Sequence, residues 1–395
     1  MHARDHWQLN PRIDFLNHGS FGACPKIVLQ KQHDLIRSLE QDPIAYLAPE
    51  RDLEPKLDEV RNKIATLVNA SATDIAFVRN ATDGVNAVLS SIPLQPGEEI
   101  LITNHGYNAC NNAAQFAAQR TGARVTMANV PFPLTTQQAV LDALDSQISP
   151  QTRLILVDHV TSPTGLIFPV EEIISMAHAR NICVFVDGAH APGMIQLDLS
   201  RMKPDFYTGN HHKWLCGPKT SGFLYVQPEL QHQVRPNVIS HSANRPRPKR
   251  SRFISEFDWT GTYDPSPLLA VPAALDFMRN LYPGGLVELL ETNRQKALLA
   301  RRILCDALAM EPPSPDCMIG SLVTIPINAD QFCRRGETGA PAETLQKILR
   351  WDHQFELPVF AFEGKDPHCL RVSMQAYNET SQVARLARIL LSLKR

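Results

Sequence analysis

The stretch Ile182-Cys-Val-Phe-Val-Asp187-Gly-Ala-His190 is an apolar run that ends in a carboxylate followed by small residues. A run that is apolar at every position is typical of a parallel strand covered on both faces, because a half-exposed strand would alternate apolar and polar residues. In open α/β sheets, ligands bind at the carboxyl ends of such strands. The pattern therefore predicts a buried strand that places Asp187 at the edge of a ligand site. The alternative is that Asp187 caps a following helix.

Similar apolar runs alternate with amphipathic segments from about residue 53 to residue 223, which predicts an α/β fold with a mostly parallel sheet layered by helices. We expect strands at Glu99 to Thr103, Arg124 to Val130, Arg153 to Val160, Ile182 to Asp187, Phe206 to Gly209 and Gly222 to Val226. We expect helices at Gly84 to Ser91, Asn108 to Arg120, Thr136 to Ser146 and Val170 to Arg180.

The composition changes beyond Pro283, where a long helical pattern rich in leucine and arginine begins. We expect a helix from Leu286 to Met310 and then strands at 322–327, 357–362 and 370–374, which together predict a smaller α+β domain. The predicted organisation has three parts: an N-terminal segment, residues 1–20, that packs on the small domain and the active site; a large domain, residues 21–283; and a small domain, residues 284–395.

Composition and charge argue against several classes of partner. The 395 residues carry a formal net charge of -1, so no long-range field favours nucleic acid or an anionic membrane. The eight cysteines include no Cys-x-x-Cys pair, which argues against a zinc knuckle and a disulfide framework. No stretch is long and apolar enough to span a bilayer, and no apolar run follows the charges at the N-terminus. We therefore expect a cytoplasmic protein.

A lysine in the segment Thr208-Gly-Asn-His-His-Lys213-Trp lies between polar residues and an apolar turn. Burial lowers the pKa of a lysine and makes its neutral amine available to form an imine with an aldehyde. A carboxylate at Asp187 would keep a pyridine nitrogen protonated, so that the ring draws electrons from an α-carbon. The alternative is a surface lysine whose stem packs on Trp214. The two histidines before it have no further Cys or His partners at ligand spacing, so we expect no metal site.

Two further segments have the residue types that bind anions. Small polar residues in Arg79-Asn-Ala-Thr-Asp-Gly84 precede a predicted helix, and a helix N-terminus binds phosphate through its free N–H groups. The alternative is an ordinary N-cap at Thr82 or Asp83. Arg371 lies inside an otherwise apolar strand, where its guanidinium group would bind a substrate carboxylate. The alternative is a salt bridge with a nearby acid of the chain.

The order of these segments resembles that of the class V aminotransferase family of fold-type I pyridoxal 5'-phosphate (PLP) enzymes. The resemblance is greatest to the isopenicillin N epimerase-like branch, through Leu16-Asn-His-Gly-Ser-Phe-Gly22, His159-Val-Thr-Ser-Pro-Thr-Gly165, Tyr207-Thr-Gly-Asn-His-His-Lys-Trp-Leu215 and Arg371-Val-Ser-Met-Gln-Ala-Tyr-Asn378. It implies a large domain with a mostly parallel, seven-stranded type of sheet, and a smaller α+β domain. It also implies PLP as the cofactor and a homodimer with shared active sites.

The resemblance also implies roles for individual residues. Lys213 would carry PLP as a Schiff base, Asp187 would pair with the pyridine nitrogen, and His190 would hydrogen-bond the phenolic oxygen. The residues expected to hold the phosphate are Ala81, Thr82, Asn210 and His212, together with Thr262 reaching the phosphate of the neighbouring subunit. The residues expected around the ring are His105, stacked on it with Tyr107 as a rival, and Thr161 and Ser162 alongside. The residues expected to bind substrate are Arg371, Asn17 and His18, within a segment from Asn17 to Phe21 that closes over it.

Several reactions stay open at this point. The leading hypothesis is an amino-acid epimerase that works through a quinonoid intermediate, with Lys213 as general base and either His105 or Tyr107 as the second acid. The alternatives are a C–S or β-lyase, an aminotransferase, and a non-catalytic α/β binding protein. Cys369 lies two residues before Arg371 on the same predicted strand, so we expect it to be buried and not to act as a desulfurase nucleophile.

The basic, proline-rich loop at residues 244–252 lies between the α/β pattern that ends near residue 223 and the long helical pattern that begins beyond Pro283. Proline excludes it from a helix interior and from a central strand, so it is expected to be a solvated loop. A second hypothesis is that Arg245, Arg247 or Arg250 selects a substrate with a distal carboxylate.

Overall fold

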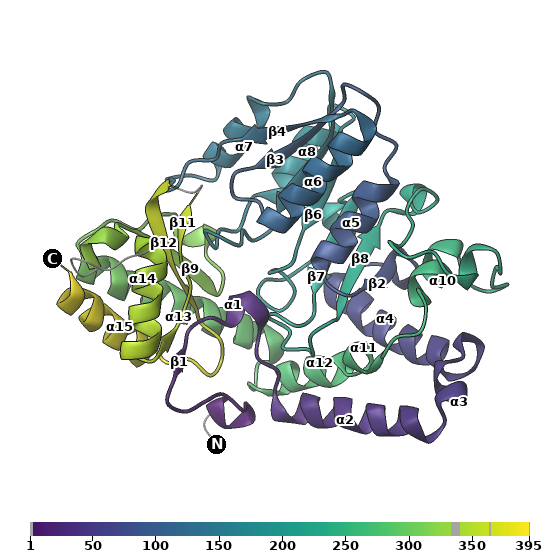
Figure 1. Cartoon of the computed structure of the whole chain (residues 1–395), viewed down its shortest axis with the longest axis horizontal. Coiled ribbons are helices and arrows are strands. Elements are labelled where there is room, and N and C mark those ends of the chain that lie inside the picture. The colour runs from purple at the N-terminus through teal and green to yellow at the C-terminus, as the bar shows by residue number, and fades with distance from the viewer. Residues whose placement is uncertain (1–2, 333–339, 363–364, 395) are drawn as a thin grey trace.

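The computed structural model describes residues 3–332, 340–362 and 365–394 (Figure 1). Its centre is a seven-stranded sheet in the order β2-β8-β7-β6-β5-β3-β4. These strands are β2 (Ile75–Val78), β3 (Glu99–Thr103), β4 (Arg124–Ala128), β5 (Thr152–Asp158), β6 (Cys183–Asp187), β7 (Phe206–Asn210) and β8 (Gly222–Val226). Strands β3 to β7 pair in parallel, and β8 is antiparallel to both β7 and β2. The predicted α/β fold with a mostly parallel sheet is confirmed.

Both faces of this sheet are covered, as the continuous apolar runs predicted. Successive residues of β5 enter different hydrophobic clusters: Ile155 and Val157 pack in one, and Leu154 and Leu156 pack in the other. The helices over the two faces include α5 (Ala81–Ser91), α6 (Asn108–Thr121), α7 (Gln138–Asp145) and α8 (Val170–His178). Figure 1 shows α5 and α6 side by side over the sheet, and their residues share the second cluster. Because both faces of the strands are buried, successive residues are apolar and do not alternate with polar ones.

The predicted and observed bounds differ at two places that concern the site. Helix α5 begins at Ala81 and not at Gly84, because the side chain of Asn80 accepts a hydrogen bond from the amide of Asp83 at 2.9 Å. Thr82 and Asp83 are therefore not the N-cap, and that prediction was wrong. The edge strand β2 was not predicted, since four residues are too few to show a period.

The C-terminal part contains the predicted long helix and a second sheet. Helix α13 (Gly285–Leu308) precedes a three-stranded antiparallel sheet of order β11-β12-β9, formed by β9 (Leu322–Ile327), β11 (Val359–Phe362) and β12 (Lys365–Ser373). Helices α14 (Pro341–Lys347) and α15 (Thr380–Leu393) complete this part. The smaller α+β unit is confirmed, with β12 starting five residues earlier than the predicted strand at 370–374.

The N-terminal residues run along the C-terminal part before they enter the helices that flank the central sheet. Strand β1 (Asp14–Phe15) pairs in parallel with β10 (Phe355–Glu356), and Figure 1 shows β1 and the short helix α1 (His18–Phe21) beside the C-terminal sheet. Further helices are α2 (Lys26–Gln41), α3 (Pro43–Leu47), α4 (Glu54–Val68), α9 (Leu199–Met202), α10 (Arg252–Asp258), α11 (Ser266–Leu269) and α12 (Val271–Asn280). Among the described helices, none combines the length and apolarity needed to cross a membrane.

The basic loop is held by carboxylates of the chain itself. Arg247 donates to Glu54 at 2.9 and 3.0 Å and to Glu50 at 3.1 Å. Arg250 donates to Asp58 at 2.7 and 2.8 Å and to Asp258 at 2.5 Å. These ion pairs tie the loop to α4 and α10, which argues against substrate binding by Arg247 or Arg250. For Arg245 the hypothesis stays a prediction. The prolines favour a loop at this place, and Arg247 and Arg250 join the loop to carboxylates of distant segments.

Candidate active site

The site begins where the central parallel strands end. Asp158 is the last residue of β5, Asp187 the last of β6 and Asn210 the last of β7, and the register places Asp158 directly opposite Asp187. All three side chains are buried. Because carboxyl ends of parallel strands meet at one edge of the sheet, three polar side chains gather there inside an apolar core. Asp158 was not predicted, although it ends the apolar run of β5 in the same way as Asp187 ends that of β6.

Lys213 lies in the loop after β7, with its amine turned toward His190. The Nζ atom of Lys213 is 3.0 Å from Nε2 of His190. Burial lowers the pKa of Lys213 to about 8, although the negative charge of Asp187 opposes this shift. The contact of Nζ with the buried His190 argues against the alternative of a solvated surface lysine, and the lowered pKa favours the neutral amine. The sequence prediction of a nucleophilic lysine is thus supported by its surroundings.

His190 is held in one tautomer by a hydrogen bond on its far side. The indole N–H of Trp214 donates to Nδ1 of His190 at 3.2 Å. Burial first, and then the positive charge of Lys213, hold the pKa of His190 well below its usual value, so the ring is neutral. With Nδ1 accepting, the single ring proton must be on Nε2. His190 therefore presents an N–H donor to the space around the lysine amine.

The carboxylate of Asp187 is fixed through both of its oxygens. Oδ1 accepts from the amide of Ala189 at 2.9 Å, and Oδ2 accepts from the thiol of Cys110 at 3.1 Å. The next helix, α9, starts at Leu199 and is capped by Asp198. The alternative that Asp187 caps a helix is therefore wrong.

The N-terminus of α5 is joined to the end of β7. The side chain of Asn210 accepts from the amide of Ala81 at 2.8 Å, and Thr82 follows in the first turn of the helix. His212 is partly buried nearby in the chain, burial lowers its pKa to about 4, and its Nδ1 has no hydrogen-bond partner within the part of the chain that is described. A helix N-terminus with positive macrodipole and an unpaired ring nitrogen are groups suited to a phosphate.

The structure separates the two rings that the sequence left as rivals. His105 is fully buried, with Nδ1 2.7 Å from the hydroxyl of Thr164 and Nε2 3.1 Å from the carbonyl of Val130. Because a carbonyl only accepts, Nε2 carries the proton and both ring nitrogens are used in the core. The ring of Tyr107 is partly exposed, and its centroid is 6.0 Å from Nζ of Lys213. Tyr107, and not His105, therefore faces the lysine amine.

Arg371 is a buried cation that meets no carboxylate among the described residues. Its Nη1 donates to the carbonyl of Ser162 and, at 3.3 Å, to the hydroxyl of the same residue, while Nη2 donates to the hydroxyl of Ser20 at 2.9 Å. Its Nε has no hydrogen-bond partner there, and burial lowers the pKa of Arg371 to about 10. The alternative of a salt bridge to an acid of the chain is not observed. A guanidinium group with a free buried N–H is suited to a ligand carboxylate.

The N-terminal segment is placed against both Lys213 and the C-terminal sheet. The hydroxyl of Ser20 donates to Oδ1 of Asn17 at 2.6 Å, and Asn17 also donates to Glu356 at 3.2 Å. His18 is buried, with Nε2 2.9 Å from the carbonyl of Lys213 and Nδ1 2.7 Å from the hydroxyl of Tyr377. Both nitrogens of His18 are thus used to join three segments of the chain, while Asn17 and Ser20 lie next to Arg371.

Thr161 and Thr262, the other two residues expected at the cofactor, are placed very differently. Thr161 is buried, and its hydroxyl is bonded to Thr164 at 2.7 Å and to the amide of Leu166 at 2.9 Å. Thr262 is exposed in the loop between α10 and α11, next to Gly261 with its positive φ of 114°. The expected contact of Thr262 is with a second subunit, so it stays a prediction.

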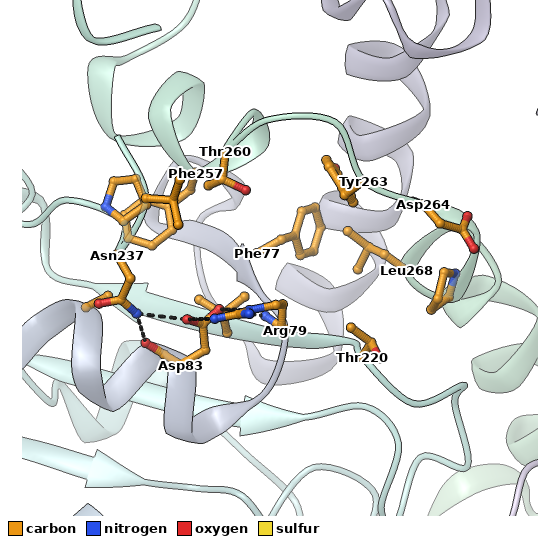
Figure 2. Close-up of a pocket in the computed structure, with 15 residues that line it drawn as sticks. Phe77, Arg79, Asp83, Thr220, Asn237, Phe257, Thr260, Tyr263, Asp264 and Leu268 are labelled. Atoms are coloured by element: carbon orange, nitrogen blue, oxygen red, sulfur yellow. Dashed lines mark hydrogen bonds and ion pairs between the residues drawn. The ribbon is translucent and has the colours of Figure 1, made fainter. Parts of the chain in front are cut away.

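The residues on either side of Gly261 and Thr262 line a cavity of about 470 Å³. Figure 2 shows Thr260 and Tyr263 on one side of it and the ion pair of Arg79 with Asp83 on the other. Arg79 and Asp83 flank the start of α5. The exposed loop and the helix N-terminus therefore lie at one hollow of the surface.

The groups gathered around Lys213 match the functional groups of PLP. They are an amine for the aldehyde, a fixed carboxylate for the ring nitrogen, an N–H donor for the phenolic oxygen and a helix N-terminus for the phosphate. Within the described ranges, no three His, Cys, Asp or Glu side chains gather to hold a metal ion. Sequence reasoning missed Cys110 and Asp158, and of these only Asp158 had a local signal. Ser20 was included only as part of the segment Asn17 to Phe21, and Trp214 only as a neighbour of Lys213, so their contacts with Arg371 and His190 were not predicted.

Comparisons with known proteins agree with this arrangement. The family model described as "Aminotransferase class-V" matches residues 25–386. The chain is 31% identical over 398 residues to isopenicillin N epimerase of Streptomyces clavuligerus, covering 98% of this chain and 96% of that protein. It is 26% identical over 406 residues to a probable chloroplastic L-cysteine desulfhydrase of Arabidopsis thaliana, covering 95% and 82%. A solved structure of C-DES with glycine covalently linked to its PLP cofactor matches with a TM-score of 0.82 at 20% identity, over 99% of both chains.

The family model spans most of the chain, and the first of these relatives exceeds 30% identity over nearly its whole length. The resemblance identified from the motifs is therefore confirmed. The chain belongs to the class V aminotransferase family of fold-type I, PLP-dependent enzymes.

Proposed function

We propose that the enzyme epimerises the α-carbon of an amino acid, as in the isopenicillin N epimerase-like branch. Epimerisation needs one group to remove the α-proton and another to return a proton on the opposite face. Lys213 offers a neutral amine as the base, and the ring of Tyr107 is 6.0 Å from its Nζ. The facing pair of Lys213 and Tyr107 is the observation that supports the proposal. The 31% identity to an isopenicillin N epimerase over nearly the whole chain is consistent with it.

The chain's own residues divide the remaining work. PLP bound to Lys213 supplies a ring that stabilises negative charge on the α-carbon of an attached amino acid. Asp187 would hold the ring nitrogen protonated, and the Nε2 proton of His190 would bond the phenolic oxygen. Arg371 would bind the substrate carboxylate and so orient the α-proton. The amine of Lys213 would take that proton at Nζ.

A C–S or β-lyase is the second candidate. It needs a base at the α-carbon but no second acid on the opposite face, and a relative named as a probable L-cysteine desulfhydrase covers 95% of the chain. Desulfurase-type chemistry through Cys369 is disfavoured, since that thiol is buried and burial raises its pKa to about 12. Transamination would use the same base and ranks behind both.

One experiment separates these reactions. Purified holoenzyme is incubated with D- and L-amino acids and cysteine conjugates in deuterated water. Racemisation with deuterium at the α-carbon supports the epimerase, pyruvate release supports the lyase, and a keto acid without pyruvate supports the aminotransferase. Lys213→Ala is the control for the base: it should lose the borohydride-sensitive chromophore and all three activities, and retention of that chromophore would refute the assignment of Lys213.

We also propose a homodimer in which Thr262 completes the phosphate site of the partner subunit. Its exposed position beside a cavity at the start of α5 supports this arrangement. A mixture of two inactive variants, Lys213→Ala and Thr262 replaced by Arg, should regain activity, because one of the two sites in a mixed dimer keeps both residues. Light scattering gives the oligomeric state. A monomer, or a mixture without activity, would contradict the proposal.

A further inference from the structure

Cys110 is a buried thiol that contacts the reaction centre without a role in the mechanism above. It lies in the first turn of α6, and its Sγ is 3.1 Å from Oδ2 of Asp187. Its side chain is 1% exposed. Burial, together with the negative charge of Asp187, raises the pKa of Cys110 well above its usual value. The group is therefore a thiol and not a thiolate, so it can donate its S–H to the carboxylate.

Asp158 constrains the same carboxylate from the neighbouring strand. It is opposite Asp187 in the register of β5 and β6, and paired residues of adjacent strands project to the same face. Its oxygens receive only long contacts, at 3.4 Å, from the amides of Tyr107 and Ser162. Burial, and then the charge of Asp187, raise the pKa of Asp158 well above its usual value. The carboxyl group of Asp158 therefore lies beside that of Asp187 in the core, and repulsion between the two limits the orientations open to Asp187.

We propose that Cys110 is a positioning residue for Asp187, which uses its thiol to hold the carboxylate in the orientation that meets the ring nitrogen of PLP. Each carboxylate oxygen accepts in two directions. The amide of Ala189 and the thiol of Cys110 each use one direction, which leaves the others for the cofactor. A thiol is a weak donor, so it orients the carboxylate while leaving most of the charge for the ring nitrogen. The inference rests on the PLP assignment and not on which reaction follows.

The test separates the donor from the volume of the side chain. Cys110→Val removes the donor and puts an apolar side chain, larger by about one methyl group, in its place, whereas Cys110→Ser keeps a donor. Since the thiol is a weak donor to a charged acceptor, the loss of its hydrogen bond in the valine variant should raise the dissociation constant of PLP by about fivefold. The serine variant should stay within about twofold of the wild type. Both are measured on holoenzyme by equilibrium dialysis and by the Schiff-base absorption.

Controls keep the comparison decisive. Cys305→Val changes another buried thiol, in α13, and should leave cofactor affinity unchanged. Unfolding midpoints without added PLP measure the effect of each variant on the fold itself, separately from its effect on cofactor binding. If Cys110→Val fails to fold, Cys110→Ala takes its place against the serine variant. Equal PLP affinity in the valine variant and the wild type, or equal weakening by serine and valine, would overturn the proposal.

Discussion

Replacing Arg371 with methionine should leave the folded enzyme as stable as before, or more stable, while weakening its binding of the substrate carboxylate. Arg371 is 5% exposed and has no carboxylate partner among the residues of the described ranges. Burial lowers its pKa from 12.5 to about 10. A difference of this size corresponds to about 3 kcal/mol against the charged form. Part of this cost is offset by hydrogen bonds to Ser162 and Ser20.

The methionine variant removes the buried charge and also those hydrogen bonds. We therefore expect its free energy of unfolding to change by between 0 and about +2 kcal/mol. Without the buried guanidinium group, the enzyme should bind the transition state of a carboxylate substrate about 3 kcal/mol less tightly. This loss lowers kcat/KM by about 150-fold. Arg371→Lys keeps the charge but not the fork of donors, so its loss should be smaller.

Urea denaturation of substrate-free holoenzyme and steady-state kinetics measure the two effects. Arg61 is the matched control, because it is equally buried but donates to both oxygens of Asp258 at 2.7 and 2.8 Å. Arg61→Met takes one of two cations, Arg61 and Arg250, away from the buried carboxylate of Asp258, so it should lose about 2 kcal/mol or more of stability. If Arg371→Met were destabilised as strongly as Arg61→Met and kept its kcat/KM, the assignment of a substrate carboxylate to Arg371 would be refuted.

The remaining predictions concern the aromatic rings of the site and the pH dependence of stability. Tyr107→Leu should shift the Schiff-base absorption and lower kcat. His105→Leu should mainly lower the unfolding midpoint, because the two hydrogen bonds of His105 lie in the core. Absorption spectroscopy and calorimetry distinguish the two variants, and equal spectral shifts would contradict the assignment. Burial lowers the pKa values of four buried histidines, His18, His105, His159 and His211, and of the partly buried His212 to about 3 or 4. Since the unfolded chain binds protons below pH 6.5 and the folded one does not, stability is full above pH 6.5 and falls as the pH is lowered toward 4. Each such histidine should cost about 1.4 kcal/mol at pH 5.5, and urea titrations at pH 7.5 and 5.5 that gave equal stability would contradict this.

The sequence was sufficient to predict a feature where that feature depends on the residues of a single short segment. The apolar run of β6 predicted a doubly covered strand, and strand length then placed Asp187 at its end. The apolar neighbours of Arg371 correctly argued against a salt bridge within the chain. Lys213 was found in the same way, because polar residues lead to it and an apolar turn follows. In these cases hydrophobic period and chain direction determine which side chains reach the sheet edge.

Other features depend on segments far from one another in the chain. Cys110 and Asp187 are 77 residues apart, and Asn210 caps a helix that begins 129 residues earlier. Arg250 is neutralised by Asp58, which lies 192 residues away. No short pattern encodes these contacts, because they arise only when separate elements pack together.

The sequence by itself determined the order of the candidate groups along the chain: the carboxylate of Asp187, the amine of Lys213 and the guanidinium group of Arg371, each at a position set by its own neighbours. Only the tertiary structure decided that Tyr107 and not His105 faces Lys213. The two residues follow β3 and are two positions apart, but the ring of His105 is bonded in the core and the ring of Tyr107 lies near the amine. It also decided the protonation of the site, because a pKa depends on burial and on charges brought together by folding. The spacing of apolar residues is a local property of the sequence. Burial and the interactions between charges exist only once the chain is folded.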